Sequence, residues 1–148
     1  MTIELAMATA IIVLGLIQVV ATAIEYRRVH GIAYANTARD VPSGKPDSKL
    51  LCRLTRAQNN LAETAPYFIG LAIIISMAGL TSPTTRLAAI AFVVLRILYL
   101  PLYAFGVPNV RGLVWLASFV ALCVMATAAA AAVSWHDAFT LVWATGHS

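Results

Sequence analysis

The sequence predicts an all-α protein, a transmembrane four-helix bundle that runs up, down, up and down within a single domain over residues 1–148. Three observations lead to this prediction. Hydrophobic residues make up 61% of the chain. Charged residues make up 11%, against about 25% in soluble domains. Four apolar stretches each hold the roughly 20 residues that a helix needs to cross a hydrocarbon core about 30 Å thick.

The four apolar stretches run over residues 5–24, 61–80, 87–107 and 112–133. Backbone polar groups must be paired in lipid, and the stretches lack the alternation typical of barrel strands, so we expect helices. The first stretch has no basic segment ahead of it. Its flanks therefore favour a membrane span over a cleaved signal peptide.

The connections between the spans contain helix-start and turn residues. The longest runs from residue 25 to about residue 50, and Ser48 at its end is placed to cap a helix that begins before its apolar run. Pro83 suits the first turn of the third helix. A short turn is expected at residues 107–109. Within the first span, Gln18 is expected to hydrogen-bond to another helix.

Basic residues gather in the connection between the first two apolar stretches, where seven of the ten Lys and Arg residues lie within residues 25–60. The positive-inside rule therefore predicts that this connection lies in the cytoplasm and that both termini lie outside. Trp135 and Trp143 would then lie at the outer interface. The net charge of +4 follows from this topology and gives no indication of nucleic acid binding. The scattered histidines show no metal-ligand spacing, so no metal is expected.

The second span carries polar residues along one helix face. Their spacings of four, three and four residues place them on the same side. The residues of this stripe are Arg56, Asn60, Glu63 and Tyr67, and Arg53 extends it by one turn. Glu63 is the most informative, because it lies within the apolar run, where an ionisable group is costly unless it is paired or hydrated.

The third span carries a matching stripe formed by Arg96, Tyr99 and Tyr103. Arg96 lies roughly 15 Å into this span, too deep to reach the headgroups easily. Two explanations remain open. Arg96 and Glu63 could pair inside the bundle and fix the helix register. Alternatively, the two stripes line a ligand cavity, which is the default expectation for intramembrane charges.

The same residues form two motifs that resemble the MAPEG family, the membrane-associated proteins of eicosanoid and glutathione metabolism. Residues 56–66 are similar to the second-helix signature R-x-x-x-N-x-x-E-x-x-P. Residues 95–103, followed by Gly106-Val107-Pro108 and Arg111, are similar to the second motif, especially in the bacterial branch. The resemblance covers residues 56–115.

The resemblance implies a homotrimer with a glutathione site between neighbouring subunits, opening towards the cytoplasmic leaflet. Arg111 resembles the arginine that stabilises the glutathione thiolate. Two departures from the leukotriene synthase branch are visible: Thr64 replaces a tyrosine, and Arg111 lies one residue further from Tyr103. By position, the residues that would bind glutathione are Arg56, Gln58, Asn60, Glu63, Arg96, Tyr99 and Tyr103.

The residue types suit this ligand. Arginine forks bind carboxylates through paired, charge-assisted hydrogen bonds, and Glu63 suits the ammonium group. A lipophilic second substrate would arrive through the bilayer. The resemblance thus implies a membrane-bound glutathione transferase or peroxidase in a bacterial inner membrane. A non-catalytic scaffold or accessory subunit of the same fold stays open as an alternative. A small transporter is less favoured, because no internal repeat is present.

Overall fold

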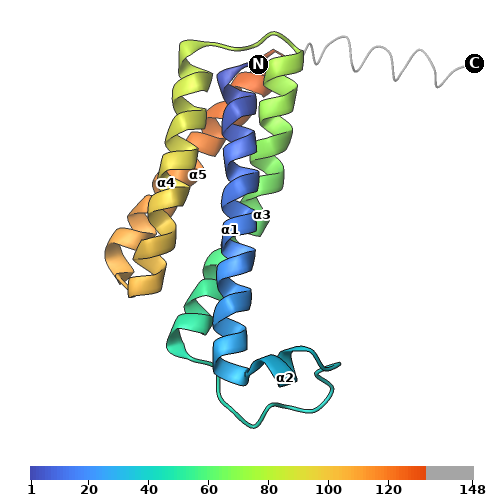
Figure 1. The fold of residues 1–148 in the computed structure, drawn as a ribbon. Coiled ribbons are helices and arrows are strands. Elements are labelled where there is room, and N and C mark those ends of the chain that lie inside the picture. Colours follow the sequence, from blue (N-terminus) through green and yellow to red (C-terminus); the bar gives the residue numbers. More distant parts are fainter. Residues whose placement is uncertain (133–148) are drawn as a thin grey trace, which may run out of the picture.

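The computed structural model describes residues 1–132, which form four long helices and one short helix (Figure 1). The helices are α1 (Ile3–His30), α2 (Ile32–Ala35), α3 (Lys49–Met77), α4 (Pro83–Phe105) and α5 (Pro108–Ala131). The four long helices run alternately up and down, and no strand occurs among residues 1–132. The predicted all-α, four-helix architecture is therefore confirmed.

Each of the four long helices has the length and apolar composition needed to cross a membrane. The chain is accordingly an integral, multi-pass membrane protein. The 29 residues of α3 correspond to about 44 Å, more than the hydrocarbon core requires. As expected from Ser48, this helix begins twelve residues before its apolar run, which starts at Leu61.

The helix ends follow the local sequence. Ser48 caps α3 by accepting a hydrogen bond from the backbone N–H of Leu51. Ser82 and Thr85 form a reciprocal capping box at the start of α4, where Pro83 occupies the first turn. The predictions for Ser48 and Pro83 are confirmed. The turn expected at residues 107–109 is shorter than predicted, because α5 already begins at Pro108 and leaves only two residues between α4 and α5.

Polar contacts join three helices at the N-terminal end of the bundle. The hydroxyls of Thr2 and Ser76 lie 2.6 Å apart, linking α1 to the end of α3. The Thr85 hydroxyl donates to the Glu4 carboxylate at 2.6 Å, linking α4 to α1. Glu4 is 0% exposed, so its carboxylate is enclosed by the protein. This end of the bundle is closed by short side chains from all three helices.

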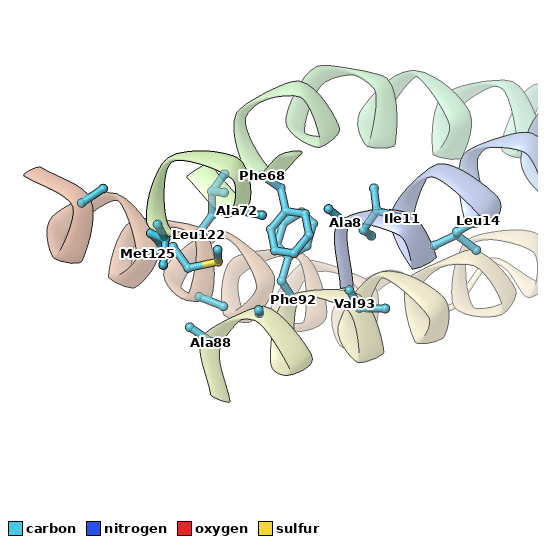
Figure 2. Close-up of a cluster of buried hydrophobic side chains, with 14 of the residues drawn as sticks. Ala8, Ile11, Leu14, Phe68, Ala72, Ala88, Phe92, Val93, Leu122 and Met125 are labelled. Carbon is cyan, nitrogen blue, oxygen red and sulfur yellow. The ribbon is translucent and has the colours of Figure 1, made fainter. Parts of the chain in front are cut away.

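An apolar core fills the centre of the bundle (Figure 2). Phe68 of α3 and Phe92 of α4 stack with ring centroids 4.3 Å apart and planes 10° apart. Small residues around this pair allow the helices to approach closely. The core members labelled in Figure 2 are Ala8, Ile11, Leu14, Phe68, Ala72, Ala88, Phe92, Val93, Leu122 and Met125.

The helices pack in two main pairs, α1 along α3 and α4 along α5. Within residues 1–132, the two pairs are joined by contacts of α4 with both α1 and α3 and of α3 with α5, whereas α1 and α5 are not in contact. One long side of α1 is consequently left open and apolar. Its exposed residues include Val13, Leu16, Ile17, Val20 and Ile24. Such a face suits lipid or another membrane helix.

Candidate functional site

Arg96 is the most unusual side chain of the described region. It is 1% exposed, and its Nη1 donates a 2.5 Å hydrogen bond to Oδ1 of Asn60. Its Nε and Nη2 are buried without a hydrogen-bond partner. A buried cation with two unsatisfied nitrogens is costly unless another group completes its shell. Two donors of Arg96 therefore lack an acceptor within residues 1–132 of a single chain.

Aromatic rings continue from Arg96 along α4 to the start of α5. The Arg96 guanidinium carbon lies 5.8 Å from the centre of the Tyr99 ring. The Tyr99 and Tyr103 ring centroids are 5.4 Å apart. Arg111, from the first turn of α5, places its guanidinium carbon 4.6 Å from the centre of the Tyr103 ring. We call this series the polar row: Asn60, Arg96, Tyr99, Tyr103 and Arg111.

The polar row brings two guanidinium groups to opposite ends of one pair of tyrosines. Each guanidinium lies within about 6 Å of a ring, the range in which a cation is attracted to the π-face. Tyrosine hydroxyls both donate and accept hydrogen bonds. The row can therefore bind a ligand that presents several anionic or hydrogen-bonding groups along its length.

Arg56 and Glu63 lie on the exposed surface of α3. The ion pairs within residues 1–132 join Arg28 to Glu25 and His30 to Asp47. Glu63 thus does not pair with Arg96 in the single chain, and the explanation of these charges as a register-fixing ion pair is wrong for this part of the structure. Both groups remain available to a ligand or to a second chain.

Gln58 lies apart from the other predicted ligand residues. It lines a cavity of about 250 Å³ with Tyr26, Arg27 and Arg39, on the side of α3 that faces α1. Two residues along a helix correspond to a rotation of about 200°, so Gln58 and Asn60 point in nearly opposite directions. One chain cannot bring both side chains to the same small ligand.

Gln18 corrects one expectation. It is 2% exposed and lines a cavity of about 190 Å³ together with Gln58, but its Oε1 has no hydrogen-bond partner. One turn further along α1, the buried Oγ1 of Thr22 also lacks a partner. The helix-to-helix hydrogen bond expected of the Gln18 acceptor is not formed. Burial of this side chain was predictable, but its partner was not.

Thr64 is turned into the bundle and does not contribute to the exposed face of α3. Its hydroxyl donates to the backbone carbonyls of Asn60 and Leu61, at 3.2 and 3.3 Å. Such bonding within the helix satisfies the hydroxyl locally. The leukotriene synthase branch has a tyrosine at this position. The Thr64 hydroxyl does not replace that tyrosine on the exposed face of α3.

Arg53 has a contact that its place on the stripe did not indicate. Its Nη1 donates to the backbone carbonyl of Ala104 at 3.0 Å, so a side chain of α3 reaches the end of α4. Helix periodicity assigned Arg53 to a face but could not name this partner. The available signal was Gly106, which marks the end of α4 where carbonyls need donors.

These features define the class: a polytopic membrane protein of four helices in which polar side chains from α3, α4 and α5 meet beside the apolar core. The family model of the MAPEG family matches residues 5–131, so the chain belongs to the MAPEG family. The match includes the whole polar row as well as Arg56, Gln58 and Glu63. No curated protein and no solved structure matches the chain significantly.

Proposed function

We propose that this chain is a membrane-bound glutathione transferase, which converts the glutathione thiol to a thiolate for attack on lipophilic electrophiles. One observation carries the proposal. The Arg96 guanidinium is buried with two unpartnered nitrogens, in a row that ends at a second arginine, Arg111. Glutathione offers two carboxylates, one ammonium group and one thiol. A carboxylate would complete the hydrogen bonds of Arg96, at the strength typical of charged pairs.

Each remaining residue has a role that suits its chemistry. Arg56 would bind the second carboxylate, and Glu63 would bind the ammonium group. Both are exposed, so neither is occupied by an internal partner that the ligand would have to displace. Asn60 orients Arg96 through its side-chain oxygen. The tyrosines Tyr99 and Tyr103 would form the wall against which the peptide lies.

Arg111 would stabilise the thiolate. A free thiol with a pKa near 8.5 is mostly protonated at neutral pH, and lowering that pKa by about two units takes roughly 2.7 kcal/mol. A guanidinium at hydrogen-bond distance in a partly dry site supplies an interaction of this size. The thiol proton passes to water, the sulfur electron pair forms the new C–S bond, and the leaving group departs with the electrons of its broken bond.

The same thiolate would also support peroxidase chemistry. On a lipid hydroperoxide the sulfur would form an S–O bond as the O–O bond breaks, and an alcohol would leave. A second glutathione thiol would then displace the oxygen as water, giving the disulfide. Two thiols are oxidised and one hydroperoxide is reduced. Product analysis with each substrate class separates the two activities.

The direction of Gln58 supports a site shared between chains in a homotrimer. Within one chain Gln58 faces α1, together with Arg27 and Arg39, whereas Asn60 faces α4. If Gln58 binds the same glutathione as Asn60, it must come from the neighbouring subunit. The open apolar side of α1 provides surface for such an association.

The charge distribution supports a topology with the first connection in the cytoplasm and both termini outside, in a bacterial inner membrane. The polar row extends towards the turn between α4 and α5, at the end of the bundle where the basic connection also lies. In this orientation the site would open to cytoplasmic glutathione. Lipophilic substrates would reach it from the bilayer.

The test is glutathione binding by the purified protein in nanodiscs, followed by calorimetry and thiolate absorbance. Arg56→Ala and Glu63→Ala should each weaken binding by about tenfold, the cost of one charged hydrogen-bonded contact. Arg86→Ala is the matched control, because Arg86 is an exposed arginine at the opposite end of α4. If both site variants bind as tightly as the wild type, the glutathione assignment is wrong.

A scaffold function remains the second candidate, and the bonding of Thr64 to its own helix favours it, because one potential ligand contact is absent. The decisive measurement is turnover of a chlorodinitrobenzene and of a lipid hydroperoxide by protein that binds glutathione. Binding without a thiolate signal and without turnover would support the scaffold.

A further inference from the structure

At the end of α4, the backbone carbonyl of Ala104 accepts a hydrogen bond from a side chain of another helix. Gly106 adopts the left-handed conformation with φ 76°, and the chain then turns into α5. The N–H group of Gly106 donates to the carbonyls of Leu102 and Tyr103, and the N–H group of Val107 donates to the carbonyl of Leu102. This is the usual way in which a helix end satisfies two of its last carbonyls. The Ala104 carbonyl accepts its hydrogen bond from Arg53 of α3 instead.

The guanidinium of Arg53 occupies the space above Gly106. A Cβ atom at position 106 would lie 2.5 Å from Nη2 of Arg53 and 2.6 Å from its guanidinium carbon. Gly106 therefore serves two purposes: it permits the positive φ, and it leaves room for the arginine. A cation at this place also interacts favourably with the negative end of the α4 dipole.

The α4–α5 turn decides how two members of the polar row meet. Only Gly106 and Val107 separate the two helices, with Tyr103 before the turn and Arg111 after it. The 4.6 Å approach of Arg111 to the Tyr103 ring depends on the angle at this turn. Arg53 fastens the turn to α3, the helix that also carries Asn60.

We propose that Arg53 is a positioning residue that holds the α4–α5 turn against α3 and thereby places Arg111 over Tyr103. Its role in thiolate formation rests on the function proposed above, whereas its hold on the turn does not. Arg53 need not touch glutathione to act. It joins the helix that would bind the peptide to the turn that would place the thiolate partner.

Hydrogen exchange tests the hold on the turn directly. In Arg53→Gln, the amides of Gly106 and Val107 should exchange about tenfold faster, because the turn loses a charged hydrogen bond. Lys49→Gln is the matched control: it removes one positive charge from an exposed position one turn away on α3. Unchanged exchange of these two amides in Arg53→Gln would overturn the proposal.

The thiolate measurement separates positioning from a purely structural role. In Arg53→Gln the apparent pKa of bound glutathione should rise by about one unit, while the dissociation constant stays within about threefold. In Arg53→Lys, which keeps a cationic donor, part of the shift should be recovered. Faster exchange of the turn with an unchanged thiolate pKa would show that Arg53 only stabilises the fold. A wild type that binds no glutathione would overturn the proposed function, and exchange alone would then decide the hold on the turn.

A double substitution provides an independent check. Gly106→Ala should displace the Arg53 guanidinium and accelerate exchange by itself, because the added Cβ meets it at 2.5 Å. If the two residues act as one unit, Arg53→Gln should add less than about twofold to the exchange rate in the Gly106→Ala background. Fully multiplicative effects would contradict the proposed contact.

Discussion

The helices α3 and α4 contact each other at two levels along the bundle. At one level the side chains are fully packed, and at the other some polar atoms lack a partner. At the first, Phe68 and Phe92 stack at 4.3 Å with both rings 0% exposed. About two helical turns away on α3 and one turn away on α4, Asn60 and Arg96 meet, and two nitrogens of the guanidinium are left without partners. The same two helices thus form one level that is closed by packing and one that is not. The second level leaves two hydrogen-bond donors unpaired within residues 1–132.

The closed level also helps the incomplete level to tolerate its charge. The guanidinium carbon of Arg96 lies 5.2 Å from the centre of the Phe92 ring. The aromatic pair of the closed level therefore also packs beneath the Arg96 guanidinium. A rigid apolar level next to a polar one keeps the arginine in place before any ligand arrives. Preorganisation of this kind reduces the ordering cost of binding.

The largest expected effect comes from a substitution that disrupts the packing of the closed level. Phe92→Ala should lower the free energy of unfolding by about 3 kcal/mol, because the cavity removes the stacking and dispersion contacts of a buried ring. The measurement is thermal or denaturant unfolding in detergent. Val94→Ala, at a 47% exposed position of the same helix, is the control and should cost well under half as much. Equal losses would show that the level around Phe92 is not tightly packed.

The next effect concerns chemistry alone. Arg111→Ala should raise the pKa of bound glutathione by about two units and so lower the thiolate fraction, and with it turnover, roughly 25-fold at neutral pH. The binding constant should change little, because the substitution removes stabilisation of the thiolate and not of the peptide. Arg86→Ala should match the wild type in both measurements. A thiolate signal that survives Arg111→Ala would assign the role to another residue.

Replacing Arg96 sharpens the contrast between the two levels. Arg96→Met should leave the unfolding free energy of the ligand-free protein unchanged or raise it by about 1 kcal/mol, because an unsatisfied buried cation gives way to an apolar chain of similar length. Glutathione binding should weaken by about tenfold or more. This pattern is the opposite of the one expected for Phe92→Ala. A strongly destabilised Arg96→Met would mean that the arginine is satisfied within the bundle.

The smallest effect lies at the N-terminal end. Thr85→Val should cost about 1 kcal/mol, the value of one buried hydrogen bond, because Glu4 loses its donor and α4 loses its capping box. Thr85→Ser keeps the hydroxyl and should cost less than half as much. Glutathione binding should be unaffected in both variants. A loss of binding would show that the two ends of the bundle are coupled.

Much of the fold was predictable from sequence because membrane helices leave strong local signals. The apolar runs located the four spans, and Ser48 and Pro83 marked two helix starts. Periodicity also placed Arg96 inside the bundle. Periodicity fixes which residues share a face, but it does not say which neighbour that face meets. Arg53 and Gln18 illustrate this limit. Helix packing decides that Arg53 contacts the Ala104 carbonyl and that the Gln18 acceptor has no partner.

The candidate site was predictable in composition and less so in arrangement. Asn60, Arg96, Tyr99, Tyr103 and Arg111 do lie in one continuous row. Gln58 was assigned by family resemblance to the same site, although helix geometry turns it the opposite way. The roles of all these residues in glutathione binding remain predictions. Because their positions are known, each role can be tested by a single substitution.

The enclosed carboxylate of Glu4 has a consequence for biogenesis. Its donor, Thr85, is synthesised 81 residues later in the chain. The first helix is therefore synthesised before the hydroxyl that donates to one of its carboxylate oxygens. Until α4 arrives, this helix end carries a group that resists deep insertion. We therefore expect the arrival of α4 to favour the final depth of α1, which would couple the membrane integration of the first and third spans.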